Sequence, residues 1–532
     1  MLLYKIKVIG DLTPSLEIGL FPILERLLPI KFIYFNQGEI DVAGEIIIKD
    51  WLKEEIIVRS NSVPSLTMSL LTNEVENQCI QVEINFLNNP SVPFPFRGRR
   101  VNTKLSADYS VLSLHDNETV LATINEKPIW LVSEIGQVKY FRSAFSLPQI
   151  LPNQNFSDLF NGECFLEMLI LLEFIREVTA STMYHCAPLR AGFIIDDPNL
   201  HWPRYGFVDY REIAAHARRE NYHVSFATIP LDTWFTNMAP VDLFKKNSQW
   251  LSLSIHGNNH AKEELAGNYS ETLRKALLLQ ANWRIQCLEQ KTKISVCRVM
   301  IPPHGACSEE ILAELPKCGF EAACISAGSL RAYNKDKPWI KTLGFSPSET
   351  IKDSTVLPRW GLTGSIHNAL LIAAYLGQPM ILRGHHQDLK HGVELFDEFA
   401  KFINGLGNVF WSNMTNLSRL NYLSRMDGAV CYVKPLGTKI FFKPPSEATS
   451  IIIEKMGAIN DSTWQVVSME GSVQKILPSE PLFLSDYMHR QMLIESAVSK
   501  ITNVATTGFK PTSIRLIARR LLTEARDRFL TF

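Results

Sequence analysis

Between about residues 189 and 412, short apolar runs alternate with amphipathic segments. The apolar runs are AGFII, HVSFATI, WLSLSI, CRVMI, FEAACIS, PMILRG and NVFWS. The segments between them, such as VDYREIAAHARREN, SETLRKALLLQANWRIQCLEQ and GVELFDEFAKFING, carry apolar residues at helical spacing. Strands that alternate with helices indicate βα units and a mostly parallel sheet. Seven or so such units over roughly 225 residues favour an α/β domain built as a (β/α) barrel.

The two flanking regions have different patterns. Residues 1–185 mix strand-like runs (YKIKVIG, IKFIYF, GEIIIKD, CIQVEINFL) with a helix that is apolar over most of its faces, CFLEMLILLEFIREVTA, and predict an N-terminal α/β domain. A hairpin is expected there with its turn at 125–127. Residues 416–532 are mostly strand-like, with DGAVCYVKP, TKIFFKPP, TSIIIEKM and TWQVVSME, and predict a β-rich accessory domain. The last 45 or so residues are expected to be helical, with one helix starting at Asp486 and another capped by Thr512. The expected domains are therefore 1–185, 186–415 and 416–532.

Composition narrows the class of protein. The 532 residues are 46% hydrophobic and 20% charged, with 54 basic and 54 acidic residues, so the chain can bury large cores and has no charge bias toward nucleic acid. The basic segment RLIARR near the end is expected to be the solvent-exposed face of an amphipathic helix. No apolar run reaches the roughly 18 residues of a membrane span, and the start lacks a signal-peptide pattern. The nine cysteines show no CxxC spacing, which favours a reduced, cytoplasmic protein. The oligomeric state is not indicated.

Two strands of the central region end in metal-binding residue types. Asp196 and Asp197 follow AGFII, and two adjacent carboxylates repel each other unless a cation lies nearby. His256 and His260 follow WLSLSI, and they would share one helix face if the segment AKEELAG continues a helix from there. In a parallel barrel both strand ends open onto one rim. One carboxylate and two imidazoles provide three protein ligands and leave a position for water, the arrangement of a catalytic zinc-type site.

The order of these motifs resembles the polysaccharide deacetylase superfamily (NodB-like carbohydrate esterases). The pair DD is followed by H-x3-H, a Pro-Pro-x-Gly loop and a late strand that ends ILRGHHQD. The resemblance implies a distorted (β/α) barrel over about residues 189–412 that removes N- or O-acetyl groups from a sugar or polysaccharide. It also implies that Asp196 is the general base, that Asp197, His256 and His260 hold a divalent metal, with Zn²⁺ the expected ion, and that His385 or His386 is the general acid.

Two positions differ from the family pattern. Pro198 replaces the glycine that usually follows DD, and Ile301 stands where the proline-rich loop often carries an arginine. Arg190, Arg359 or Arg383 could supply that positive charge from another strand end.

Smaller signals surround the motifs. The segment DPNLHWPRYG supplies Asn199, His201, Trp202 and Tyr205, which could line a glycan cleft or simply pack in a loop. Trp234 and Trp360 leave the same alternatives open, and His304 could reach the site or simply face solvent. In the N-terminal region, ETVLATINEKPIWLVSEIGQVKYF is similar to the late strands of a class I glutamine-amidotransferase-like domain, but no G-x-C-x-G nucleophile elbow precedes it.

Three functions remain open. The leading prediction is a metal-dependent hydrolase that deacetylates a sugar or glycan. A second is another carbohydrate hydrolase on the same barrel, although a glycosidase needs two carboxylates across a cleft and Asp196 and Asp197 are adjacent. The third is a glycan-binding or assembly protein with a degenerate deacetylase site.

Overall fold

The computed structural model describes residues 3–10, 19–34, 41–49, 62–69, 79–106, 109, 111–151, 153–161, 165–362, 366–454, 464–467, 473–484, 491–496 and 513–529. It contains two compact units. Unit 1 comprises 1–183, 338–345 and 367–375, and unit 2 comprises 184–337, 346–366 and 376–532. The predicted boundary near residue 416 lies inside unit 2, and the three-domain division stays a prediction.

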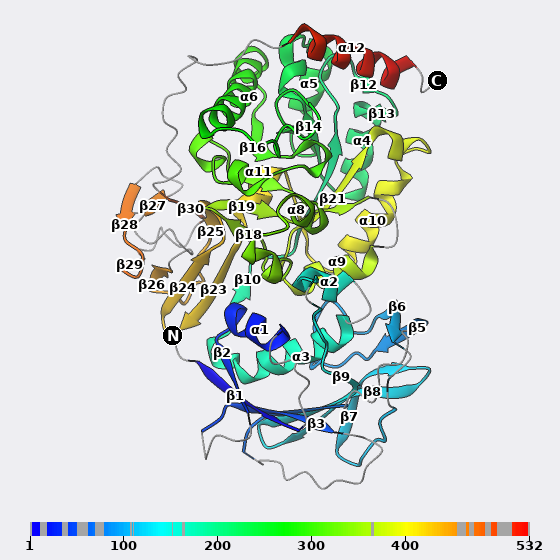
Figure 1. Ribbon diagram of the computed structural model, residues 1–532, viewed down its shortest axis with the longest axis vertical. Coiled ribbons are helices and arrows are strands. Elements are labelled where there is room, and N and C mark those ends of the chain that lie inside the picture. The colour runs from blue at the N-terminus through cyan, green and yellow to red at the C-terminus, as the bar shows by residue number, and fades with distance from the viewer. Residues whose placement is uncertain are drawn as a thin grey trace. The chain divides into compact units, whose positions relative to one another are not determined.

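Unit 1 is built on a nine-stranded mixed sheet in the order β2-β1-β3-β4-β9-β8-β7-β5-β6 (Figure 1). The strands are β1 Tyr4–Ile9, β2 Ile30–Tyr34, β3 Gly44–Lys49, β4 Ser65–Ser69, β5 Cys79–Phe86, β6 Arg100–Ser106, β7 Glu118–Ile124, β8 Lys127–Ile135 and β9 Val138–Ser146. The pairs from β2 to β9 are parallel and the others are antiparallel. The expected hairpin is β7–β8, whose turn residues Asn125 and Glu126 both have positive φ.

The helices of unit 1 are α1 Phe21–Leu27, α2 Phe156–Asn161, η2 Ala180–Thr182, η6 Pro338–Thr342, α9 His367–Tyr375 and α3 Phe165–Val178. The last of these is the expected apolar helix, and most of its residues are buried. Burial on most faces explains why its polar stripe is narrow, formed by the partly exposed Glu173, Arg176 and Glu177.

Unit 2 contains a ten-stranded sheet in the order β18-β19-β17-β16-β15-β14-β11-β21-β20, with β22 paired to β11. Its strands are β11 Arg190–Asp196, β14 Val224–Thr228, β15 Leu251–Ile255, β16 Val296–Met300, β17 Ala322–Cys324, β18 Glu349–Ile351, β19 Ser354–Leu357, β20 Trp360–Gly361, β21 Met380–His385 and β22 Phe410–Trp411. All pairs are parallel except β18–β19. The seven predicted strands are present, whereas β18, β19 and β20 were not predicted.

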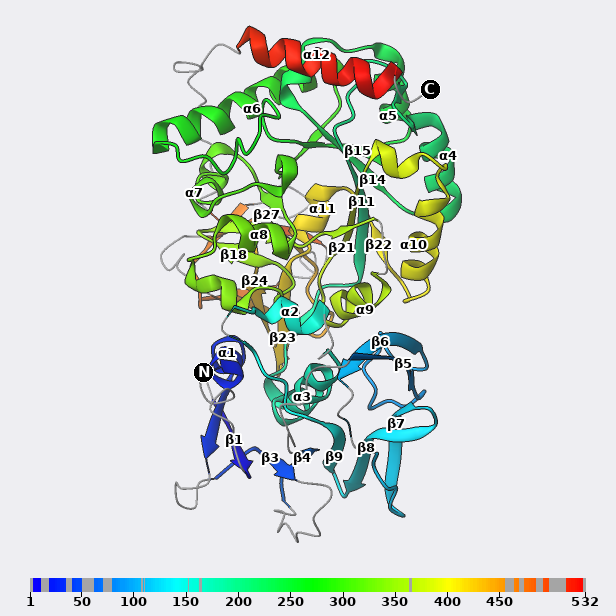
Figure 2. The same cartoon turned by 45° about the vertical axis from the view of Figure 1, so that its right-hand side comes forward.

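This sheet curls into a partial barrel (Figure 2). In the strand order, β18 and β20 stand at the two ends and are not paired with each other among the described strands. Helices α4 Tyr210–Glu220, α6 Glu271–Thr292 and α10 Glu394–Asn404 lie outside the curl (Figure 2). The N-cap Asp209 starts α4, because its carboxylate accepts two amide hydrogen bonds. Further short helices are α5 Met238–Lys246, α7 Glu309–Leu312, α8 Ala327–Tyr333, α11 Met414–Arg419, η3 Pro230–Trp234, η4 Pro303–Gly305, η5 Pro316–Cys318 and η7 His386–Leu389.

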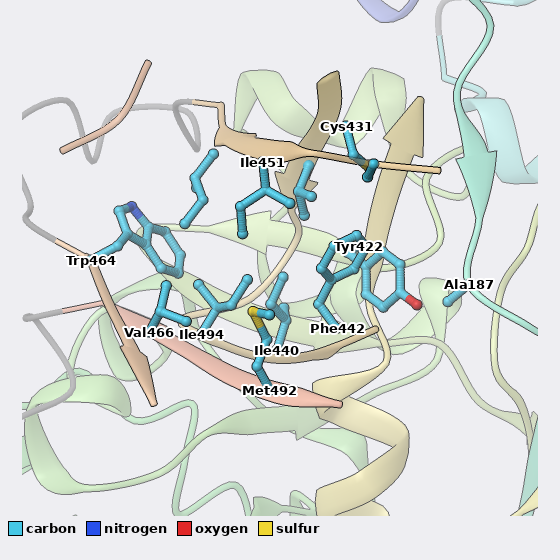
Figure 3. Close-up of a cluster of buried hydrophobic side chains, with 13 residues drawn as sticks. Ala187, Tyr422, Cys431, Ile440, Phe442, Ile451, Trp464, Val466, Met492 and Ile494 are labelled. Atoms are coloured by element: carbon cyan, nitrogen blue, oxygen red, sulfur yellow. The ribbon is translucent and has the colours of Figure 1, made fainter. Parts of the chain in front are cut away.

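The remaining strands of unit 2 form smaller sheets. One has the order β10-β23-β24-β26-β29, another the order β25-β30-β27-β28, and β12 pairs with β13. Their bounds are β10 His185–Cys186, β12 Arg204–Tyr205, β13 Val208–Asp209, β23 Tyr422–Asp427, β24 Val430–Pro435, β25 Lys439–Phe442, β26 Ser450–Ile453, β27 Trp464–Val467, β28 Val473–Ile476, β29 Pro481–Phe483 and β30 Met492–Ser496. Side chains from both larger sheets, such as Ile451 and Trp464, form one buried cluster (Figure 3), as expected for a small sandwich.

The C-terminal helix prediction is correct only in part. Helix α12 spans Ile514–Phe529, but residues 492–496, which were expected to be helical, form strand β30. The segment MLIES pairs with β25 on one side and with β27 on the other. This pairing with distant strands outweighs the local helix propensity of the segment. The predicted start at Asp486 and cap at Thr512 lie outside the described residues. Among the described helices, none is long and apolar enough to cross a membrane.

Candidate metal centre

The acidic pair lies at the carboxyl end of the central strand β11. Asp196 is the last residue of β11, aligned with Ala227 of β14 on one side and His385 of β21 on the other. The Asp196 side chain is buried. Asp197 follows with φ of 83°, a left-handed conformation that turns the chain immediately after the strand.

The His256–His260 loop is not helical, so the expected helix from AKEELAG is wrong. Residues 256–260 form an irregular loop and 262–266 form turns. The loop wraps around the carboxylate of Glu264, which accepts hydrogen bonds from the backbone N–H groups of Asn258 (2.7 Å), Asn259 (3.0 Å) and His260 (3.0 Å). These three N–H groups donate to the Glu264 side chain, and His260 adopts a left-handed φ of 56°. The left-handed backbone at His260 excludes an α-helix through this residue.

The loop also depends on a glycine. Gly257 has a φ of 64°, and a Cβ at this position would lie 2.2 Å from Oε1 of Glu264. Only glycine allows both the positive φ and this close approach.

The structure brings the three predicted ligands together. Oδ1 of Asp197 lies 3.1 Å from Nε2 of His260 and 3.5 Å from Nε2 of His256. One ligand atom from each residue lies within 4.8 Å of the other two. Burial opposes ionisation of Asp197, but the contact with His260, together with nearby positive charge, holds the pKa of Asp197 well below its ordinary range. The ligand roles themselves remain predictions.

The chemistry of this donor set fits a divalent cation. Nδ1 of His256 lies 2.8 Å from the carbonyl oxygen of Ile301, so it carries the proton and Nε2 carries the lone pair. Burial lowers the pKa of His256 to about 4, which keeps the ring neutral near pH 7. The Nε2 lone pair and the Asp197 carboxylate are therefore two acceptors that face each other. A cation between them removes the repulsion, and two imidazoles with one carboxylate form the ligand set of a catalytic zinc site.

Asp196 lies beside this centre and is held by two arginines. Its Oδ2 is 3.8 Å from Nη1 of Arg359 and 3.8 Å from Nε of Arg383. Its Oδ1 is buried and has no hydrogen-bond partner among the described residues. Two of the three arginines suggested as replacements for the one missing at Ile301 thus reach the acid. Arg190 does not, because it lies at the start of β11 and bonds Gly377 and Asn421.

The structure separates the two candidate acid histidines. His385 ends β21 beside Asp196, is partly exposed, and its ring lies 3.1 Å from Nη1 of Arg383. His386 is buried against Tyr205, and its Nε2 lies 3.8 Å from a carboxylate oxygen of Asp527. His385 is thus the one with access to solvent beside the acidic pair.

The aromatic and polar residues of the rim divide into two groups. Asn199, His201 and Tyr205 are buried, whereas Trp202 and Trp234 are exposed. His304, which was left open, lies at the metal centre: its ring is 5.0 Å from that of His260. Burial, with the nearby His260, lowers the pKa of His304.

Two features of the site were missed by the sequence reasoning. Glu264 received no role, although an acid six residues after an HGN segment could have suggested a carboxylate that caps the loop. Helix α12 was assigned to a solvent-facing position, which is wrong for Arg520: its guanidinium forms a buried ion pair with Asp232 at 2.5 Å. The adjacent Arg519 donates to the carbonyl oxygen of His260. No local sequence signal indicates these contacts.

The sequence matches no protein family model and no curated protein. Solved structures do match. One is a carbohydrate deacetylase, Agd3, with 11% identity, a TM-score of 0.48, and 91% of this chain and 99% of that chain covered. A second is a family 4 carbohydrate esterase from Streptomyces lividans in complex with acetate, with 11% identity, a TM-score of 0.26, and 43% and 94% covered.

A third match is a mutant of BA3943, a CE4 family pseudoenzyme with restored enzymatic activity. It shares 13% identity with this chain, with a TM-score of 0.27 and 44% and 69% covered. All three TM-scores lie below 0.5 and all three identities below 25%. Function is therefore inferred from the geometry of the site.

Proposed function

We propose that the protein is a metal-dependent hydrolase that removes N- or O-acetyl groups from a sugar or polysaccharide. The observation that supports this proposal is the convergence of Asp197, His256 and His260 next to a separate buried carboxylate, Asp196. Three protein ligands leave room for water and substrate, and a free carboxylate beside them provides a base. The metal proposed is a divalent ion, with Zn²⁺ favoured by the two imidazole ligands.

A bound divalent cation would supply Lewis acidity toward the acetyl carbonyl and lower the pKa of a coordinated water. Asp196 would accept the proton of the attacking water, and the flanking guanidinium groups of Arg359 and Arg383 would hold this carboxylate in place. His385 is the proposed acid that protonates the leaving alcohol or amine, because it is accessible and lies next to Asp196.

The test is acetate release from a panel of acetylated sugars and oligosaccharides, with and without a chelator. Wild type is compared with Asp197→Ala, which is expected to lose both metal and activity. Acetate release that depends on metal supports the proposal. Release of sugar without acetate would indicate a glycosidase, and sugar binding without either product would indicate a glycan-binding protein. Either of these two results would overturn the proposal.

A further inference from the structure

One side of the C-terminal helix α12 is apolar and faces solvent. Its large apolar side chains Ile514, Ile517, Leu521 and Leu522 are 85%, 40%, 48% and 72% exposed. Ile514, Ile517 and Leu521 follow an i, i+3, i+7 spacing, so they lie along one side of the helix. An amphipathic helix usually packs such a stripe against a core. In α12 the stripe is left open.

Charged contacts fix this orientation of the helix. Arg520 forms its buried ion pair with Asp232, and one turn later Glu524 lies 2.8 Å from Nδ1 of His201. Figures 1 and 2 both show α12 lying across the end of unit 2. The helix cannot rotate its apolar stripe inward without breaking these contacts, so the stripe stays on the surface.

The exposed charged side chains of α12, over Ile514–Arg528, are all arginines. They are Arg515, Arg519 and Arg526, which share one row beside the apolar stripe because they lie four and seven residues apart. Together with Leu522 they line one shallow groove. The acidic side chain of Glu524 is only 12% exposed, since it faces the protein. The free side of the helix therefore combines apolar surface with positive charge.

Exposed aromatic side chains extend this surface beyond the helix. Trp234 of η3 is 65% exposed, and it lines one depression of about 330 Å³ together with Ile517 and Leu521. The ring centroids of Trp234 and Phe235 are 5.7 Å apart, and those of Phe235 and the 53% exposed Trp202 are 6.5 Å apart. Contiguous exposed apolar patches mark protein or membrane interaction sites. Tryptophan is enriched where a protein meets the headgroup level of a bilayer.

We propose that this surface binds an anionic lipid bilayer. We call it the α12 face, and it consists of the exposed apolar and basic side of α12 with the adjoining Trp202, Trp234 and Phe235. Helices that lie in a membrane interface have this composition: their apolar side chains enter the boundary of the acyl chains, and their basic side chains contact lipid phosphates. Membrane binding at the α12 face does not require the proposed hydrolase activity.

The charges favour a lipid surface over a second copy of this chain. In a symmetric dimer the same patch meets itself. The arginine rows of the two copies would then approach each other, and α12 exposes no acidic side chain over Ile514–Arg528 to pair with them. A nucleic acid would pair with the arginines but would leave Ile514 and Leu522 in water. An anionic bilayer satisfies both kinds of side chain.

The α12 face adjoins the candidate metal centre. Arg519 donates to the carbonyl oxygen of His260 at 3.2 Å, so the arginine row reaches the loop that carries the histidines. A bilayer bound to the α12 face would therefore keep the metal centre close to the membrane surface.

The test is sedimentation of the full-length protein with vesicles of phosphatidylcholine alone and of an equimolar mixture of phosphatidylcholine and phosphatidylglycerol. Wild type is expected to bind the mixed vesicles at least about tenfold more tightly than the neutral ones and to be released by salt. Leu522→Gln should weaken binding to the mixed vesicles about tenfold, because glutamine keeps the helix propensity but does not insert. The double variant Arg515→Gln/Arg526→Gln should weaken it about 30-fold, since each charge contributes about fivefold. Phe483→Gln is the matched control, because Phe483 is 74% exposed but lies on β29.

A second readout is the quenching of tryptophan fluorescence by brominated lipid in the mixed vesicles. Trp234→Phe is expected to reduce the quenching while most of the binding remains, because phenylalanine still inserts.

The proposal is overturned if wild type does not bind the mixed vesicles, or if it binds both kinds of vesicle equally. Binding that Leu522→Gln leaves unchanged also overturns it. The oligomeric state is measured without lipid, and a dimer that Leu522→Gln dissociates would identify a second copy as the occupant instead.

Discussion

Glu264 is expected to control metal binding although it is not a ligand. The substitution Glu264→Gln keeps the size of the side chain but removes its charge. In the protein, this buried carboxylate accepts the N–H groups of Asn258, Asn259 and His260 and thereby fixes the loop between His256 and His260. The two histidines are brought to Asp197 by this loop rather than by a helix.

The magnitude follows from the three hydrogen bonds. A bond to a charged group contributes about 1.5–3 kcal/mol and a neutral one about 0.5–1.5 kcal/mol, so the bonds from Asn258 and His260 to Oε1 each lose roughly 1 kcal/mol in Glu264→Gln. The amide NH2 at the Oε2 position cannot accept the bond from Asn259, which costs about 2 kcal/mol more. The three together lose roughly 4 kcal/mol. Part of this loss falls on loop stability in the metal-free protein, so the metal dissociation constant is expected to rise about 10- to 100-fold.

The assay is competition for Zn²⁺ between the protein and a chromophoric chelator. Glu263→Gln is the matched control, because Glu263 precedes Glu264 and is exposed, and it should bind Zn²⁺ like wild type. Wild-type Zn²⁺ affinity in Glu264→Gln, with unchanged folding, would refute the view that this carboxylate organises the ligands.

Other perturbations give further expectations. Asp196→Asn should retain metal, measured by elemental analysis, and lose at least about 10²-fold in acetate-release rate. Gly257→Ala should lose metal, because its Cβ would lie 2.2 Å from the Glu264 carboxylate. Arg359→Ala should lower kcat without loss of metal, and a wild-type kcat would contradict its contact with Asp196. Burial opposes ionisation of Glu524, but its bonds to His201 and Arg528 lower its pKa from 4.5 to about 2. Its stabilising effect on α12 is therefore fully present above about pH 4.5 and lost as the pH falls toward 2. The protection factors of the α12 amides, which correct for the pH dependence of intrinsic exchange, should fall in this window. In Glu524→Gln they should already be lower at pH 7 and should not fall further in this window.

The parallel sheet and the convergence of Asp197, His256 and His260 could be predicted from the sequence. The apolar runs of unit 2 have the spacing of buried parallel strands, and such strands present their carboxyl ends at one edge. Asp197 and His256 each follow such a run. Whether the two residues lie close together therefore depends only on how near their strands stand in the sheet. The order β11-β14-β15 places one strand between them.

The conformation of the histidine loop could not be predicted. The H-x3-H spacing fits one helix face equally well, and the choice was decided by Glu264, which folds back on three backbone amides. Periodicity reports burial and contains no information about a buried carboxylate that replaces helical hydrogen bonds. The contact of Arg359 with Asp196 could not be predicted from periodicity either, because it joins β11 to a segment more than a hundred residues later.

Helix α12 reverses the usual pattern, in which apolar side chains face the core and charged side chains face solvent. Its apolar residues Ile514 and Leu522 are 85% and 72% exposed, while Arg520 and Asp527 are buried against the rim of the sheet. Burying ions costs several kcal/mol each before pairing, so a helix kept only for stability would turn its leucines inward. The buried ion pairs instead fix orientation, because each charge accepts only one arrangement of partners. That property suits a helix that contacts the candidate metal centre, because Arg519 of α12 donates to the carbonyl oxygen of His260.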